Sequence, residues 1–326
     1  MYPTVDRHGL GVGAALVSEP MRRRAVGAVL VSAALFGTTG TARVLGPSST
    51  TPLGVGASRL VVGGLALLAL LPILGYRRAE VFALWRTPGG LVAGLCTVLY
   101  QVCFFAGVQR AGVAVGTLAA IGSGPVLTGL LARSLLGERP GRSWLVATGL
   151  CVTGLTLLVL GGGGSGSRDV LGILLAVLAG LSYAAYTVLA KQQLDRGHAP
   201  SVVMAAAFGL GGLLSIPLLL AQPLTWLTTS KGIALALYLG LAATTLAYLL
   251  FVRGLAVLPA GPVTTLMLAE PIVAATLGIV VLDERLSDPG VVGATLVLVG
   301  LVVQGRHAAA NTPTPEGGVV GLNRPA

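Results

Sequence analysis

The chain has 326 residues, of which 54% are hydrophobic and 10% are charged, and its formal net charge is +10. A soluble domain of this length needs far more charge on its surface, so these values exclude the soluble enzymes and soluble binding modules. The charged residues lie in short clusters between apolar runs that are long enough to cross roughly 30 Å of hydrocarbon. The chain is therefore predicted to be an integral membrane protein.

Ten apolar windows, each about 19 residues long, follow one another along the chain. They are continuous runs, not alternating segments, so α-helices are favoured over barrel strands. The first run follows a basic MRRR segment, but its length and the nine later runs favour a retained helix over a cleaved signal peptide. The expected spans are 25–43, 52–75, 88–109, 112–134, 142–160, 170–190, 200–220, 231–253, 261–282 and 289–305.

The segments outside these spans are polar or rich in glycine and proline. Residues 1–24 and 306–326 are each predicted to be a disordered cytoplasmic tail, and Met21 is a second candidate for the true start. The glycine-rich segment 161–169, GGGGSGSRD, is predicted to link two halves of the chain. It fits the GxGxxG pattern, but no strand precedes it, so we reject a dinucleotide site.

The basic residues predict the orientation in the membrane. If both termini are cytoplasmic, 15 of the 21 Lys and Arg residues lie inside and six lie outside, as the positive-inside rule requires. These residues are dispersed among loops without interleaved aromatic residues, which indicates affinity for anionic membrane lipid and excludes a nucleic-acid partner. Only two of the 21 are Lys, and this Arg-rich, Gly-rich composition indicates a multi-pass protein of the bacterial plasma (inner) membrane.

The second half of the chain repeats the first. At an offset of 146 residues, GPVLTGLLARSLLGERPGRSWLVATGLCVTG (124–154) aligns with EPIVAATLGIVVLDERLSDPGVVGATLVLVG (270–300). The predicted repeats, 25–160 and 170–305, each hold five spans. Since five is odd, the second repeat enters the membrane from the opposite side.

The predicted fold class is therefore all-α, with ten transmembrane helices arranged as two inverted five-helix repeats. Inverted repeats whose interrupted helices meet near the midplane are typical of secondary transporters, which expose a central site alternately to each side.

These features resemble the EamA type of the drug/metabolite transporter superfamily, over residues of about 25–305. The resemblance rests on the two five-helix halves, on the Pro and Glu of GPVLTGLLARSLLGE and EPIVAATLGIVVLDE, and on the Arg of GASRLVVGG. The second Pro-to-Glu stretch ends in LDE where the family usually shows LGE. The resemblance implies transport of small metabolites, amino acids or drug-like compounds, often coupled to an ion gradient. We expect an exporter that works by alternating access and has no cofactor.

Two charged residues inside the spans have no charged counterpart in the other repeat. Glu270 aligns with Gly124 and Arg59 aligns with Ala207, so the scaffold itself requires neither charge. A charge at mid-helix in a bilayer costs about 2.5–3.5 kcal/mol. Glu270 is therefore a candidate for proton coupling or for contact with a substrate amine, and the alternative is a structural pair with the backbone or with Arg59. Arg59 is a candidate for binding a substrate carboxylate, and the alternative is a structural or snorkelling side chain.

Pro125 and Pro271 are predicted to break their helices at the central site. Pro271 has no N–H, so we expect the carbonyl of Met267 to lie free in an unwound turn beside Glu270. Other polar and aromatic residues within the spans are candidates for lining a cavity. They are Tyr100, Gln101, Ser123, Tyr183, Tyr186, Thr245, Tyr248, Thr264 and Thr265.

No catalytic or metal site is predicted. The repeat places Glu138 and Glu284 on opposite faces of the membrane, so we expect each to organise its own loop, with Arg139 and Arg285 respectively. No His lies in a span, the three Cys lack metal-ligand spacing, and no P-loop is present. A passive channel or facilitator and a non-transporting membrane subunit remain as alternatives. The expected partners are a small-molecule substrate, membrane lipid and, under the coupling hypothesis, protons.

Overall fold

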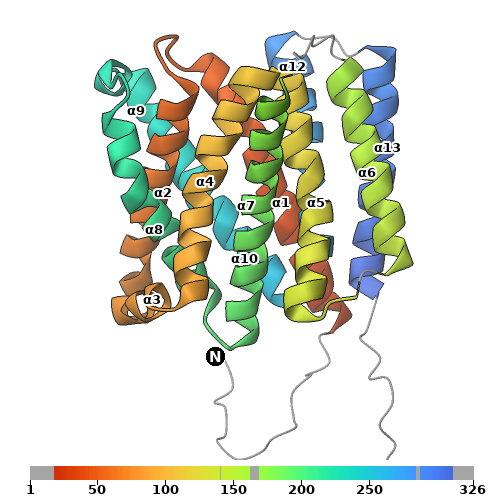
Figure 1. The fold of residues 1–326 in the computed structure, drawn as a ribbon, viewed down its shortest axis with the longest axis horizontal. Helices are drawn as coiled ribbons and strands as arrows, with labels where there is room; N and C mark the ends of the chain where they lie inside the picture. The colour runs from red at the N-terminus through yellow and green to blue at the C-terminus, as the bar shows by residue number, and fades with distance from the viewer. Residues whose placement is uncertain (1–17, 140, 162–168, 284–286, 311–326) are drawn as a thin grey trace, which may run out of the picture.

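The computed structural model describes residues 18–139, 141–161, 169–283 and 287–310. Over these residues the chain forms ten helices that are long and apolar enough to cross a membrane, with no strand. They stand side by side in one bundle (Figure 1). The predicted all-α fold with ten membrane helices is confirmed.

The first half contributes five of these helices, and the second half contributes five spans, of which two are composite. The first half consists of α1 (Glu19–Leu45), α2 (Pro52–Ile73), α4 (Pro88–Ala111), α5 (Val113–Leu136) and α6 (Arg142–Gly161). The second half consists of α7 (Val170–Asp195), α8 (Pro200–Leu220), α9 (Ser230–Leu237) continued by η2 (Tyr238–Leu246) and α10 (Ala247–Val257), α11 (Ala260–Leu266) continued by η3 (Met267–Ala269) and α12 (Glu270–Leu282), and α13 (Asp288–Ala310).

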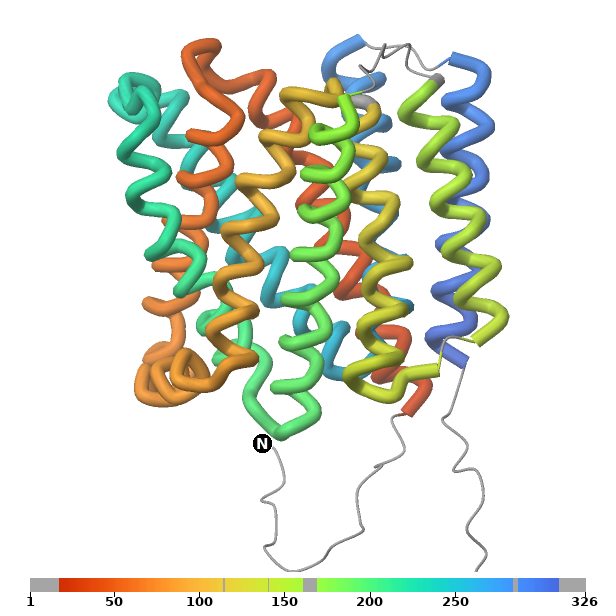
Figure 2. Tube along the Cα trace, viewed as in Figure 1, coloured from red at the N-terminus to blue at the C-terminus, as the bar shows by residue number. Residues whose placement is uncertain are grey.

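The two halves run in opposite senses through the bundle. The start of α1 and the end of α13 lie at the lower end of the view, whereas α7 starts at the upper end (Figures 1 and 2). The helices of the two halves also interleave, because α2 packs against α8, α4 against α7, and α1 against α10 and α12. The helices α6 and α13 pair with each other at one side of the bundle (right in Figure 1).

Two short helices lie between spans and were not predicted. The helix α3 (Arg78–Trp85) connects α2 to α4, and η1 (Thr225–Thr228) occupies the equivalent connection in the second half. Trp85 fastens α3 to the bundle because its indole N–H donates to the carbonyl of Ala206 on α8, at 2.7 Å. Segments of four to eight residues carry too little periodic signal to stand out beside a membrane span.

The structure describes only the inner ends of the two predicted tails and the two ends of the predicted linker. Residues 19–24 are helical, so α1 begins six residues before the expected boundary at residue 25, and α13 continues to Ala310. The rest of both tails, residues 162–168 of the linker, and the loop residues Glu284 and Arg285 lie outside the described part of the chain.

Candidate functional site

A cavity of about 80 Å³ lies between the two halves. It has room for several water molecules, which need about 10–15 Å³ each by this measure, so it suits a small ligand. Both halves contribute to its lining, whereas α6 and α13 contribute none of the described lining residues. The lining consists of Phe36, Arg59, Leu60, Thr97, Tyr100, Gln101, Ala120, Ile121 and Pro125 from the first half, and Tyr183, Tyr186, Phe208, Tyr248, Thr264, Met267, Leu268 and Glu270 from the second.

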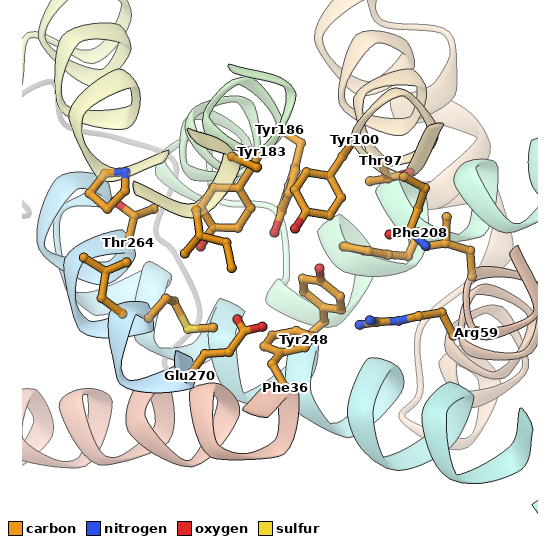
Figure 3. Close-up of a pocket in the computed structure, with 17 residues that line it drawn as sticks. Phe36, Arg59, Thr97, Tyr100, Tyr183, Tyr186, Phe208, Tyr248, Thr264 and Glu270 are labelled. Carbon is orange, nitrogen blue, oxygen red and sulfur yellow. The ribbon is translucent and has the colours of Figure 1, made fainter. Parts of the chain in front are cut away.

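Aromatic rings form one connected wall of this cavity. Tyr248 lies 3.8 Å from Phe208 and 4.9 Å from Phe36, measured between ring centroids, and Tyr186 lies 5.7 Å from Phe208. The hydroxyls of Tyr100, Tyr186 and Tyr248 point toward one another at the centre of the site (Figure 3). Each tyrosine thus buries an apolar ring in the bundle and presents a polar tip to the cavity.

Glu270 is the first residue of α12 and directly follows the 3₁₀ turn η3. Its carboxylate points into the cavity (Figure 3). Among the described residues, no hydrogen-bond partner of this carboxylate is found and no cationic group lies within 4.0 Å of it. The alternative of a structural ion pair with Arg59 therefore does not describe this conformation.

The turn before Glu270 differs from the one predicted. The backbone N–H of Glu270 donates to the carbonyl of Met267, so this carbonyl is not left free. Pro271 has no N–H to donate to the carbonyl of Met267. The tighter i to i+3 bonding of the 3₁₀ turn supplies the N–H of Glu270 as the donor instead. Pro125 lines the cavity in the other half, but α5 continues through it from Val113 to Leu136. The predicted break is therefore present at Pro271 and absent at Pro125.

Arg59 enters the cavity from α2, on the side opposite Glu270 (Figure 3). Its Nε donates to the hydroxyl of Thr244 and its Nη2 donates to the carbonyl of Ala243, both at 3.2 Å. Its guanidinium also lies over the ring of Phe36, 5.6 Å from the centroid. Arg59 is thus held by neutral groups, and its positive charge is not neutralised by an ion pair within the described residues.

Four of the predicted site residues do not line the cavity. The hydroxyl of Ser123 donates to the carbonyl of Ala120, and Thr245 donates to the carbonyl of Gly63. The Thr265 hydroxyl pairs with that of Thr148 at 2.9 Å, and Pro271 lies behind Glu270 in the first turn of α12. Thr245 and Thr265 thus join their helices to α2 and α6, whereas the Ser123 bond lies within α5.

Sequence reasoning missed several of the lining residues. Phe36 and Phe208 are apolar residues in apolar spans, so nothing in their local sequence distinguishes them from residues of the core. Thr97 donates to the carbonyl of Gly94 in the preceding turn, as many membrane threonines do. Thr244 does not line the cavity, but it accepts a hydrogen bond from Arg59, and the sequence does not distinguish it from its neighbour Thr245.

Hydrogen bonds join the two halves at the lower end of the bundle. Both carboxylate oxygens of Glu138 accept the backbone N–H of Ala260, at 3.1 Å, so Glu138 caps the first turn of α11. The Thr148 and Thr265 pair joins α6 to α11 above this cap. Glu138 thus binds across the two halves, and the predicted pair with Arg139 is not formed.

At the upper end, a second hollow of about 560 Å³ lies between the end of α1 and α12.

The Glu138 cap predicts a pH dependence of stability. Burial raises the pKa of Glu138 above its usual value of 4.5, although the bonds from Ala260 and the charge of Lys191 oppose this shift, and Asp195 adds to it. A raised folded-state pKa stabilises the fold below 4.5, and this contribution is lost as the pH rises through the raised value. Relative to Glu138→Gln, the wild-type protein is therefore expected to lose thermal stability over this pH range.

The measurement is the melting temperature of the purified protein in detergent as a function of pH. Glu138→Gln keeps an oxygen acceptor for Ala260 but cannot titrate, so the two curves should separate as the pH rises. Glu138→Ala removes the cap and is expected to cost about 1 kcal/mol. Parallel curves for the wild type and Glu138→Gln would contradict this prediction.

The chain is similar to known membrane transporters. The chain matches the EamA-like transporter family over residues 23–160 and 170–305. It is 41% identical to the uncharacterized transporter YwfM of Bacillus subtilis, over 84% of this chain and 91% of that protein. It is 30% identical to the threonine/homoserine exporter RhtA of Escherichia coli K12, over 79% of this chain and 83% of that protein.

A protein of known crystal structure has the same fold. It superposes with a TM-score of 0.73 over 87% of this chain and 97% of that chain. The sequence identity is 21%, so this likeness supports the fold alone.

Proposed function

Because the chain belongs to the EamA-like transporter family and is a multi-pass bacterial membrane protein, we propose that it is a secondary transporter that exports a small metabolite by alternating access. The observation that carries this proposal is the central cavity, where Glu270 and Arg59 face each other without an ion pair. Since neither residue is required by the repeated scaffold, their charges are available to a substrate or a coupling ion.

The charges at the site favour a substrate with both an amine and a carboxylate, such as an amino acid. Arg59 would bind the carboxylate, because a guanidinium matches the planar geometry of that group. Glu270 and the ring faces of the tyrosines would attract the ammonium group. RhtA, a relative, is named as an exporter of threonine and homoserine, which agrees with this substrate class.

A second role is proposed for Glu270, because a carboxylate without a partner inside a membrane can take up a proton. If Glu270 releases its proton only when the substrate ammonium arrives, the proton gradient drives export. A passive facilitator would bind substrate in the same cavity without the release of a proton by Glu270. A non-transporting subunit would neither bind substrate in the cavity nor release a proton.

The orientation proposed here places both termini in the cytoplasm of a cell bounded by its plasma (inner) membrane. The lower end of Figure 1 then faces inward. The Glu138 cap and the Thr148 and Thr265 pair join the halves at this inner end, and the hollow beside α12 lies at the outer end. These contacts support the proposal that this conformation is closed toward the cytoplasm.

The test is transport by the full chain reconstituted in liposomes. Labelled amino acids and small metabolites are offered one at a time, with and without an imposed pH gradient. A proton-coupled exporter is expected to move at least one of them faster with the gradient. Movement at equal rates under both conditions would support the facilitator, and no movement of any compound would support the non-transporting subunit.

A further inference from the structure

We infer that η2 holds Arg59 as a preformed carboxylate subsite, in which Thr244 positions the guanidinium and Gln101 supplies a second hydrogen-bond donor. This inference rests on the proposed function, because it names the groups that recognise one end of the substrate. Thr244 is a positioning residue here, since it acts on the substrate through Arg59.

The hydrogen bonds of Arg59 leave its outer edge available. A guanidinium has five N–H donors. Two of them are used on the side of η2, by Nε to Thr244 and by Nη2 to Ala243. Both N–H groups of Nη1 and one of Nη2 remain, which is the pair of nitrogens that binds a carboxylate with two parallel bonds.

Thr244 is fixed by its own contacts. It is fully buried, and its hydroxyl donates to the carbonyl of Leu239 at 2.8 Å, five residues earlier. Because its hydrogen is committed there, the hydroxyl oxygen meets Arg59 as an acceptor. On the other side its methyl group packs against Gly63 of α2, where an added Cβ would lie 2.5 Å from this methyl.

The π-helical form of η2 is what brings Thr244 to Arg59. Adding a residue to each hydrogen-bonded turn rotates the residues that follow, and π segments occur frequently at functional sites. The hydroxyl of the adjacent Thr245 donates to the carbonyls of Gly240 and Gly63, and no hydrogen bond joins it to Arg59. The two neighbouring threonines therefore have separate roles, and each can be replaced without removing the other's bonds.

Gln101 is a second, independent sign of a ligand. Its side chain lines the cavity, is 7% exposed, and has an amide nitrogen with no hydrogen-bond partner among the described residues. The amide nitrogen lies against Gly56 of α2, three residues before Arg59, where an added Cβ would meet it. Buried donors are normally satisfied, so we assign this unsatisfied amide, which lies against the helical turn that carries Arg59, to an acceptor that arrives with the substrate.

The subsite also gives the substrate a direction. A carboxylate at Arg59 is attracted by a positive charge, whereas the same group at Glu270 would be repelled. The ammonium end of an amino acid is therefore directed toward Glu270, across the ring of Tyr248 that lies between the two charges (Figure 3).

The experiment measures binding by the purified full chain in detergent, from the rise in melting temperature. The probes are the twenty L-amino acids and, for each that binds, the matching amino-acid amide, which lacks the carboxylate. At least one amino acid is expected to stabilise the wild-type protein, and its amide is expected to bind more weakly. Thr244→Val keeps the shape but removes the acceptor, and it should weaken amino-acid binding about tenfold. Thr244→Ser and the control Thr245→Val should keep the wild-type affinity.

The outcomes separate this inference from the proposed function. Wild-type affinity in Thr244→Val, with weak binding in Arg59→Gln, would overturn the positioning role and leave Arg59 as a ligand. Wild-type affinity in both variants would overturn the role of Arg59 as well. Equal binding of acid and amide, or no binding of any amino acid to the wild-type protein, would overturn the carboxylate subsite, while transport in liposomes tests the proposed function separately.

Discussion

Replacing Glu270 with Gln is expected to abolish the effect of a pH gradient on transport, with an accompanying loss of at least about tenfold in gradient-driven rate. Glutamine has nearly the same shape, so it fills the same place at the start of α12. It cannot bind and release a proton, however, and it offers the cavity no negative charge. The measurement is the initial transport rate in liposomes, with and without an imposed gradient.

The two roles proposed for Glu270 give different kinetics. If Glu270 carries the coupling proton, Glu270→Gln should lose gradient-driven transport but retain exchange of labelled for unlabelled substrate. If Glu270 only contacts a substrate amine, the variant should have a raised KM and still respond to the gradient. Wild-type rates with an unchanged KM would exclude both roles.

Glu80→Gln is the matched control for this experiment. It makes the same chemical change, but Glu80 is exposed in the first turn of α3, where its carboxylate accepts the backbone N–H of Arg77, and it does not line the cavity. We expect its gradient dependence to stay close to that of the wild type. A loss of gradient dependence in Glu80→Gln would show that removal of any carboxylate is enough.

The spans and the two charged site residues were predictable because their signals are local. A run of about 20 apolar residues identifies a membrane helix by itself. Charges such as Arg59 and Glu270 stand out in such a run, because most charged residues of a membrane protein lie in the loops. Repetition of the chain then identified these two charges as features that the scaffold does not require.

The partners of these residues were not predictable, because they depend on contacts between distant segments. Glu138 binds Ala260, which lies 122 residues away, so a loop-local partner such as Arg139 was the wrong expectation. Thr244 and Thr245 are adjacent and both contact α2, and a regular helical period cannot decide which one accepts from Arg59. The π-helical register of η2 decides it, and nothing in the sequence YLGLAATTL indicates that register.

The equivalent prolines show the same limit. Pro125 and Pro271 align in the repeat, so the sequence predicts a helix break at both. A proline removes one backbone hydrogen bond, but whether the helix continues or tightens depends on the residues packed around it. In α12 a 3₁₀ turn precedes the proline, whereas α5 remains a single helix.

Replacing Gly64 with Val is expected to prevent the chain from folding into a stable, monodisperse protein. Gly64 lies where α2 crosses α8, and a Cβ added there would fall on the carbonyl oxygen of Phe208. That atom belongs to the backbone of a helix, so it cannot move aside as a side chain would. Overpacking usually costs about 1–3 kcal/mol, and contact with backbone places this substitution at or above the upper end of that range.

The control is Gly149→Val on α6, where a Cβ would meet no other atom within 4 Å. It adds the same side chain to a membrane helix, so expression yield, elution profile and melting temperature should stay near those of the wild type. Equal behaviour of the two variants would contradict the close crossing of α2 and α8.

The crossing of α2 and α8 also bears on the site, because the ring of Phe208 packs 3.8 Å from that of Tyr248 in the cavity wall. The milder Gly64→Ala should therefore weaken substrate binding as well as stability, since separating α2 from α8 moves Arg59 and Phe208 apart across the same cavity.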